Sequence, residues 1–260
     1  LSAVSTLASI VLLTAACGAL SALVAGGFML LPARSRDALL PHLVSFATGA
    51  LLGAALLALL PHALDSGAGT HGIGIALAGG IIVFFVLEKM VLWRHCHADH
   101  CEAHAPEQHH RDRASATLIL WGDAFHNLLD GVLIAAAFLT DPHLGIVTTV
   151  AVFAHEIPQE VGDLAILLNG GMSRRRALAL NVAVSLTSIA GAVIAWFLLA
   201  QALELLPYAL AVAAASFLYV AVADLIPGLH RRVDARTSVQ QVALIALGIV
   251  VIALSHGFAH

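Results

Sequence analysis

Long apolar stretches separated by short polar connections dominate this sequence. Each stretch holds about 20 or more residues, the length that an α-helix needs to cross a hydrocarbon core of roughly 30 Å. Turn residues such as Asn169-Gly170-Gly171 fill most of the connections. The pattern predicts eight transmembrane helices, near Leu7–Leu31, Leu39–Leu64, Ile73–Trp93, Ala116–Leu139, Ile146–Leu168, Ala177–Ala200, Leu206–Leu225 and Val239–Phe258.

The composition excludes a soluble fold. Of the 260 residues 60% are hydrophobic and only 11% are charged, and the mean hydropathy is +0.94. So few charges could not cover the surface of a soluble protein. We therefore expect an all-α integral membrane protein in which residues 1–260 form a single transmembrane domain in contact with the lipid bilayer. The net charge of −4 gives no reason to expect nucleic acid as a partner.

The positions of the lysine and arginine residues predict the orientation. If there are eight helices, all twelve of these residues fall on one face, and a miscounted helix would scatter them over both. The positive-inside rule makes that face cytoplasmic and leaves both termini outside. The residues are Arg34, Arg36, Lys89, Arg94, Arg111, Arg113, Arg174, Arg175, Arg176, Arg231, Arg232 and Arg236.

Two similar strings suggest an internal repeat. Leu59-Leu60-Pro61 lies near the outer end of the second apolar segment, and Leu225-Ile226-Pro227 lies at the inner end of the seventh. Similar strings at opposite faces are typical of the inverted repeats of transporters, although short Leu-Pro strings also recur by chance. The pattern favours an inverted 3+2+3 arrangement of the eight helices.

Polar residues gather in the middle of the fourth and fifth segments. Residues 123–131 read DAFHNLLDG, and residues 155–163 read HEIPQEVGD. In the first string, residues 123, 126, 127 and 130 share one helix face. Each charged group at mid-membrane costs about 2.5–3.5 kcal/mol. Structural hydrogen bonds could explain one or two of these groups, but the two strings hold five acids, two histidines, an asparagine and a glutamine.

The residue types in these two strings indicate a bound cation. Neither segment contains lysine or arginine, so the acids must be protonated or bound to a cation. Imidazole together with carboxylate and amide oxygens suits Zn²⁺, Fe²⁺, Mn²⁺ and Cd²⁺, whereas Mg²⁺ and Ca²⁺ sites use oxygen alone. Pro158 removes a helical hydrogen bond and is expected to free a nearby carbonyl, as in the broken helices of transporters.

The string HNLLDG at 126–131 followed by HEIPQE at 155–160 resembles the paired signature of the ZIP (Zrt/Irt-like) metal transporters. The resemblance is greatest to the subfamily with histidine-rich loops, whose fifth helix reads His-Glu-x-Pro-His-Glu. It implies eight helices, a homodimer, and a divalent transition metal as the transported substrate, above all Zn²⁺ and also Fe²⁺, Mn²⁺ or Cd²⁺. It further implies transport towards the cytoplasm by an elevator-like shift of one helical bundle.

The resemblance also implies a ligand set on the fourth and fifth helices. Carried over position by position, it makes His126, Asp130 and His155 ligands of the primary metal. Asn127 and Glu156 would line a neighbouring second position that shares Asp130.

Three departures from the family pattern bear on this ligand set. Gln159 stands where the subfamily has histidine, and a neutral amide is a weaker ligand. Ala54 and Ala58 stand where relatives often have Asp and His. Ser188 replaces an acid that some bacterial relatives use, which favours a single well-occupied site.

A path for metal exit is predicted on the inner side of these ligands. Given the orientation above, Asp123, Glu160 and Asp163 lie towards the inner face and could form a ladder of carboxylates. Asp224 ends the seventh segment, where two alternatives stay open. Its side chain either extends to the membrane surface or contributes to metal exit.

Residues 94–115 form the one long polar connection, predicted to be a cytoplasmic histidine-rich loop. Six histidines and two cysteines within sixteen residues are typical of a metal-binding tract, but their spacing matches no zinc finger. We expect this tract to buffer or sense metal, the alternative being a merely solvated loop. Its candidate ligands are His95, Cys96, His97, His100, Cys101, His104, His109 and His110.

The competing function is an intramembrane zinc metalloprotease, which would combine a His-Glu-x-x-His string with a later Leu-Asp-Gly. Here Gln159 replaces the second histidine, Pro158 interrupts the string, and Leu129-Asp130-Gly131 comes before it. We therefore expect a transporter and no enzyme. A proton-driven exporter would need the reverse orientation or a different fold. The expected location is a bacterial inner (plasma) membrane.

Overall fold

The computed structural model describes residues 3–96, 108–169, 171–230 and 234–257, and every regular element within these ranges is a helix. The elements are α1 (Ala3–Phe28), α2 (Ala33–Gly53), the π-helix η1 (Ala54–Leu59), α3 (Leu60–Asp65), α4 (Thr70–Cys96), α5 (Gln108–Thr140), α6 (Pro142–Asn169), α7 (Arg174–Ser185), α8 (Thr187–Leu199), the 3₁₀ turn η2 (Leu203–Leu205), α9 (Leu206–Tyr219), the π-helix η3 (Val220–Leu225), α10 (Ile226–Leu229) and α11 (Ala235–Gly257).

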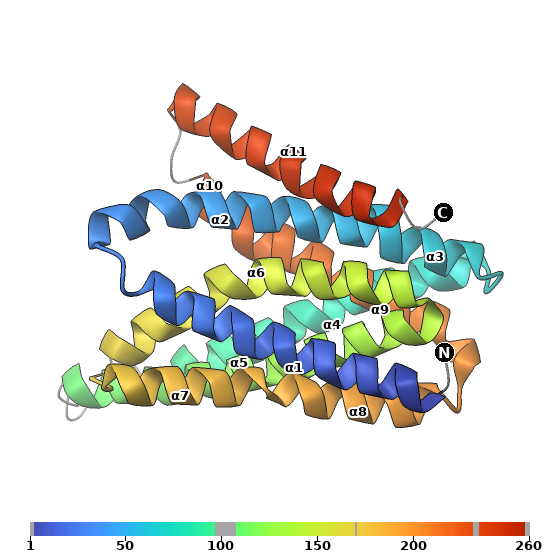
Figure 1. Cartoon of the computed structure of the whole chain (residues 1–260), viewed down its shortest axis with the longest axis horizontal. Helices are drawn as coiled ribbons and strands as arrows, with labels where there is room; N and C mark the ends of the chain where they lie inside the picture. The colour runs from blue at the N-terminus through green and yellow to red at the C-terminus, as the bar shows by residue number, and fades with distance from the viewer. Residues whose placement is uncertain (1–2, 97–107, 170, 231–233, 258–260) are drawn as a thin grey trace.

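The helices run side by side as a bundle of long rods, and α11 lies on the outside against α2 (Figure 1). The most extensive contacts join α5 to α8, α2 to α11, α4 to α9, α5 to α6 and α1 to α6. Helix α6 therefore lies inside the bundle, with α1, α2 and α5 packed around it. Helix α1 begins and α11 ends at the same end of the bundle (Figure 1).

Seven stretches of the described chain are long and apolar enough to cross a membrane. Of the eight segments predicted from the sequence, only 146–168 is not among these seven stretches. It lies in α6, whose 28 residues would extend about 42 Å. Glu156, Glu160 and Asp163 lower the apolar character of this helix. Apolarity alone therefore shows seven candidate spans, and the predicted count of eight depends on α6.

Two helical rods contain the same irregularity. The π-helix η1 is followed by Leu60-Pro61, and the π-helix η3 is followed by Ile226-Pro227. Proline lacks the backbone N–H and its ring collides with the carbonyl four residues earlier, so the preceding turn widens. These are the two strings that suggested a repeat in the sequence. The 3+2+3 arrangement itself stays a prediction.

The expected break at Pro158 is absent. Helix α6 continues without interruption from Pro142 to Asn169. Pro158 is buried among neighbouring helices. Packing against several neighbouring helices lets α6 tolerate the loss of one backbone hydrogen bond without a break.

Small residues let α5 and α8 approach closely. A side-chain carbon on Gly131 would collide with the carbonyl oxygen of Ser188, and one on Gly191 would collide with that of Leu128. Such contacts between small residues are a common means of packing membrane helices. Gly131 directly follows Asp130, so this contact fixes the position of α5 next to Asp130.

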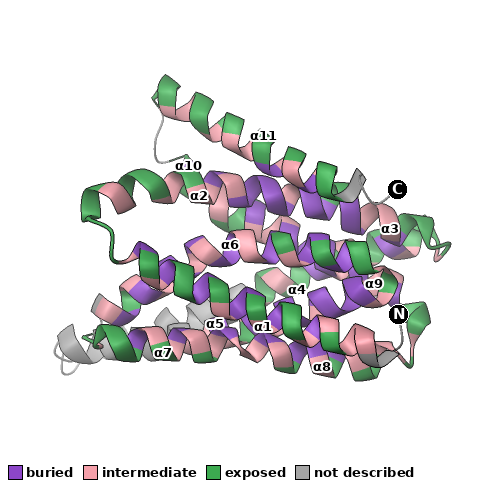
Figure 2. Ribbon diagram, in the orientation of Figure 1, coloured by how far each residue is buried: buried purple, intermediate pink, exposed green. Residues whose placement is uncertain are grey.

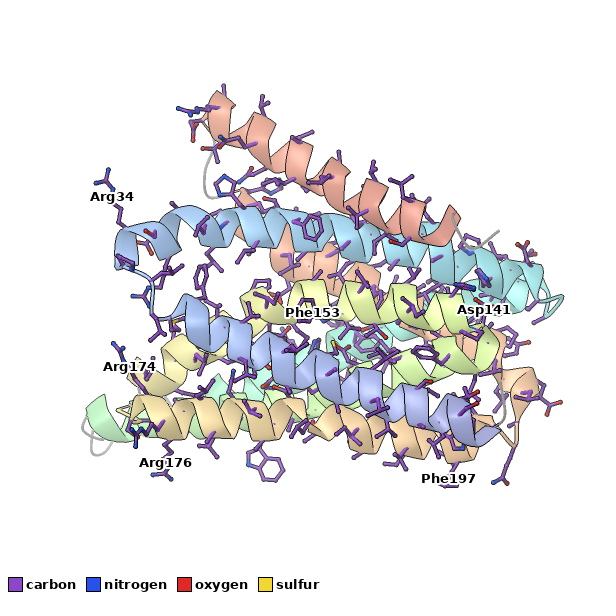
Figure 3. The ribbon with its side chains drawn as sticks, viewed as in Figure 1. Arg34, Asp141, Phe153, Arg174, Arg176 and Phe197 are labelled. Atoms are coloured by element: carbon purple, nitrogen blue, oxygen red, sulfur yellow. The ribbon has the colours of Figure 1, made fainter. Side chains whose placement is uncertain are left out.

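The exposed positions lie on the outside of the bundle and the buried positions face inward (Figure 2), and large hydrophobic residues occupy many of the exposed positions. Trp121 is 74% exposed and Phe197 is 57% exposed. Arg34, Arg174 and Arg176 lie together at one end of the bundle, and Asp141 lies near the other (Figure 3). An apolar belt with cationic groups at one end is the distribution expected of a membrane protein.

Candidate metal centre

Four side chains from α5 and α6 converge inside the bundle: His126, Asp130, His155 and Glu156, called here the four-residue cluster. His126 and Asp130 lie one turn apart on α5, while His155 and Glu156 are adjacent on α6. Each offers one ligand atom, and these four atoms all lie within 4.8 Å of one another.

Both imidazoles direct Nε2 into the cluster. His155 Nε2 lies 3.2 Å from Asp130 Oδ2, His126 Nε2 lies 3.4 Å from Glu156 Oε1, and the two Nε2 atoms are 3.3 Å apart. His155 Nδ1 lies 3.1 Å from the carbonyl of Ala151. If Nδ1 carries the proton and donates it to this carbonyl, Nε2 presents a lone pair to the cluster.

Three members of the cluster are buried, and one is partly exposed. Asp130, His155 and Glu156 are at most 2% exposed, whereas the His126 side chain is 21% exposed. Within the described part of the chain, Asp130 Oδ2 and both carboxylate oxygens of Glu156 accept no hydrogen bond. Buried carboxylate oxygens without donors are costly, so this arrangement favours a cation among them.

The open side of His126 faces a cavity of about 280 Å³, called here the acidic cavity. Its walls come from α5 and α6 on one side and from α4, α9 and η3 on the other. It lies towards the end where α5 begins and α6 ends. The polar residues that line it are Asp123, His126, Gln159, Asp163, Tyr219 and Asp224.

The structure separates the six predicted ligands into two groups. Four of them form the cluster, whereas Asn127 and Gln159 lie outside it. The Asn127 amide donates hydrogen bonds to the Asp123 side chain, at 2.8 Å from Oδ1, and to the Asp123 carbonyl. Gln159 lines the acidic cavity, as His126 does.

The three residues of the predicted exit path also separate. Asp123 and Asp163 line the acidic cavity, whereas Glu160 does not. Glu160 is fully buried and accepts hydrogen bonds from Asn181 and Ser185 on α7. Successive residues of a helix differ by about 100° around its axis, so Glu160 faces α7 while its neighbour Gln159 faces the cavity. Asp224, for which the sequence left two roles open, lines the cavity. The feature of the sequence that points to it is an acidic residue within an apolar segment.

The histidine-rich connection is shorter than predicted. Helix α4 continues to Cys96 and α5 begins at Gln108, so both ends of the predicted 94–115 loop are helical. His97, His100, Cys101 and His104 lie outside the described residues. His95, Cys96, His109 and His110 belong to the ends of these helices, in stretches where only the backbone is described.

Comparisons with known proteins identify zinc transporters as relatives of this chain. The family model described as ZIP Zinc transporter matches residues 93–256. Zinc transporter ZIP13 of Homo sapiens is 31% identical over 260 residues, covering 83% of this chain and 70% of that protein. ZIP13 of Pongo abelii is 33% identical over 231 residues, covering 83% and 66%. Zinc transporter ZIP4 of Homo sapiens is 44% identical over 119 residues, covering 46% and 18%. The chain thus spans less than two thirds of the length of the last two relatives.

Proposed function

The chain belongs to the ZIP zinc transporter family, and on that premise we propose that it transports Zn²⁺ across a membrane towards the cytoplasm through the four-residue cluster. The family comprises transporters and not enzymes. The seven apolar helices of the chain make it a multi-pass integral membrane protein. Fe²⁺, Mn²⁺ and Cd²⁺ are proposed as further substrates because the same ligand types bind them.

The observation that supports this proposal most is the spacing of the ligand atoms. The distances from the two Nε2 atoms to each other and to the Asp130 and Glu156 oxygens run from 3.2 to 3.7 Å. Around a tetrahedral Zn²⁺ with bonds of about 2.0–2.2 Å, neighbouring ligand atoms lie roughly 3.3–3.6 Å apart. Two neutral imidazoles and two carboxylates would also neutralise a divalent cation, which lowers the cost of holding charge in the membrane.

The acidic cavity is the proposed route from the cluster to the inner face. Asp123 and Asp163 lie on the wall formed by α5 and α6, and Asp224 lies on the opposite wall. His126 is both a cluster member and a lining residue of this cavity, so it connects the two. Glu160 does not line this cavity.

Three observations support eight crossings with both termini outside. An even number of crossings returns the chain to the face where it started, and α1 begins and α11 ends at the same end of the bundle (Figure 1). Adding α6 to the seven apolar helices gives that even number. Three of the arginines lie at the opposite end (Figure 3), which would be the cytoplasmic one. The proposed domain organisation is one transporter domain, residues 1–260, with a cytoplasmic metal-binding loop and a homodimeric assembly.

Two hypotheses from the sequence analysis are not supported by the comparisons. The relatives named above are animal proteins, so they give no support to a bacterial inner membrane. The metalloprotease alternative is not favoured, because the family is one of transporters and the position of the second protease histidine is Gln159, which lies outside the cluster.

Metal uptake into proteoliposomes tests the proposal. We expect Asp130→Asn to abolish Zn²⁺ uptake, because the buried carboxylate is lost while the side-chain volume is kept. The matched control is Glu204→Gln, which makes the same change of charge at an exposed position in η2. Full Zn²⁺ uptake by a folded Asp130→Asn protein would remove the four-residue cluster from the transport path.

A further inference from the structure

Phe217 of α9 packs against the imidazole of His155 from outside the four-residue cluster. The centroids of the two rings lie 6.0 Å apart and the ring planes make an angle of 63°, which is within the range of edge-to-face aromatic pairs. Phe217 is 1% exposed and is the largest fully buried side chain in the described part of the chain. Its side chain has no ligand atom, so any effect that it has on a bound metal passes through His155.

The His155 ring depends on this contact for its orientation. Its Nδ1 lies 3.1 Å from the carbonyl of Ala151, and a single hydrogen bond leaves the ring free to tilt about that bond. Its Nε2 would be bound to the cation when metal is present. Its other ring contact is with His126, which is itself a member of the cluster. Phe217 therefore supplies the ring packing that does not come from another ligand.

The contact also joins the cluster to a separate group of helices. Helix α9 packs chiefly against α4, η1 and α3, whereas α6, which holds His155, packs chiefly against α5, α1 and α2. Tyr219 and Val220, which follow Phe217 closely in the chain, line the acidic cavity. The same stretch of chain thus touches a metal ligand at Phe217 and the proposed route at Tyr219.

We propose that Phe217 is a positioning residue for the metal, which holds the His155 imidazole with Nε2 directed at the cation. This proposal rests on the proposed function, since it requires the cluster to be the metal site. Groups that orient a metal ligand contribute roughly 10- to 100-fold to metal affinity. Without the Phe217 ring, His155 gains space to turn and must lose that freedom each time a metal binds. Because Phe217 belongs to α9, the affinity of the cluster depends on how α9 lies against α6.

Equilibrium binding of Zn²⁺ and of Co²⁺ to the purified full chain tests this role. The signal of the cluster is the part that Asp130→Asn removes, so metal bound elsewhere in the chain cancels. We expect Phe217→Ala to raise the Zn²⁺ dissociation constant of the cluster about tenfold. The visible absorption of bound Co²⁺ should also change, because it depends on the geometry of the nitrogen ligands. Phe217→Leu leaves a smaller void and should show both effects to a lesser degree, and it carries the test if Phe217→Ala does not fold.

A matched control separates the loss of ring packing on His155 from general damage to the core. Phe138→Ala removes another buried phenylalanine of the same apolar core, two helical turns beyond Asp130, where its ring packs against Gly145. It should lower the unfolding midpoint as Phe217→Ala does, because both variants create a cavity. It should leave the Zn²⁺ dissociation constant and the Co²⁺ spectrum of the cluster as they are.

The positioning role would be overturned by unchanged Zn²⁺ affinity and Co²⁺ spectrum in the folded Phe217 variants. An equal loss of affinity in Phe138→Ala would also overturn it, since the effect would then come from core stability alone. Failure of the proposed function appears separately, as Zn²⁺ uptake by Asp130→Asn.

Discussion

His126 differs from the other members of the four-residue cluster in its exposure. It is the one whose side chain reaches the acidic cavity, which Gln159, one turn after His155 on α6, also lines. A metal leaving the cluster towards this cavity would pass His126 last. The residue next to His126 on the cavity side can therefore alter how firmly the metal is held.

Gln159→His is the substitution that tests this arrangement. The new imidazole would stand beside the cluster on its open side, so we expect tighter Zn²⁺ binding and slower release. Both the half-saturation constant and the maximal uptake rate should fall. Competition of Zn²⁺ against Mn²⁺ provides the check, because an added imidazole favours Zn²⁺ over the harder Mn²⁺. An unchanged metal preference, with lower stability alone, would mean that Gln159 only packs against its neighbours.

At this scale the sequence predicted which helix faces bring polar side chains together, but not the direction of every side chain. The spacing of His126 and Asp130 places them on one face of a helix whatever the tertiary structure. The roles of Gln159 and Glu160 depend instead on where α7 packs against α6. Two adjacent polar residues point about 100° apart, and their sequence contains no sign of which one meets the neighbouring helix.

Helix α6 is joined to α7 by a buried polar contact that does not involve the cluster. The carboxylate of Glu160 accepts hydrogen bonds from the Asn181 amide and the Ser185 hydroxyl. All three residues are fully buried. The Ser185 hydroxyl also lies 2.8 Å from the carbonyl of Asn181. Because Glu160 is one turn from Glu156, this contact fixes α6 close to the cluster.

Removing this contact should destabilise the protein. We expect Glu160→Ala to cost about 2 kcal/mol, since the buried Asn181 amide loses its acceptor, whereas the Ser185 hydroxyl can still donate to the Asn181 carbonyl. Glu160→Gln should cost less, because the Asn181 amide can rotate and present its otherwise unpartnered oxygen to the new amide. Unfolding midpoints in detergent measure both effects. Equal losses for the two variants would show that the Asn181 amide does not adapt.

Among the larger elements, the sequence located the helices well and their irregularities poorly. The apolar stretches predicted the positions of all the long helices. Leu60-Pro61 and Ile226-Pro227 were visible as similar strings, but a proline in a helix is compatible with a break, a kink or a widened turn. Packing decides among these. It gave π-helices before Pro61 and Pro227, and an uninterrupted helix at Pro158.

For the molecule as a whole, the two cavities make the cluster accessible from one side. The acidic cavity is about 280 Å³ and reaches His126, whereas the second cavity, at Asp130 and Glu156, holds about 10 Å³. The open side faces the end of the bundle that would be cytoplasmic. We infer that the structure corresponds to an inward-facing state, in which metal would leave and not enter. On the proposed transport path, the carboxylates of the acidic cavity would then act after the metal has been bound.

The double variant Asp123→Asn/Asp163→Asn tests this order of events. Neither residue belongs to the four-residue cluster, so the affinity for Zn²⁺ should change little. Both line the acidic cavity, where their charge would draw the cation away from His126, so we expect the maximal rate of uptake to fall several-fold. Asparagine keeps an oxygen at position 123 that can accept the hydrogen bond now made by Asn127. Equilibrium Zn²⁺ binding to the purified protein and initial uptake rates in proteoliposomes separate the two effects. Loss of binding with an unaltered rate would contradict this order of events, because the carboxylates would then take part in binding the metal and not in its release.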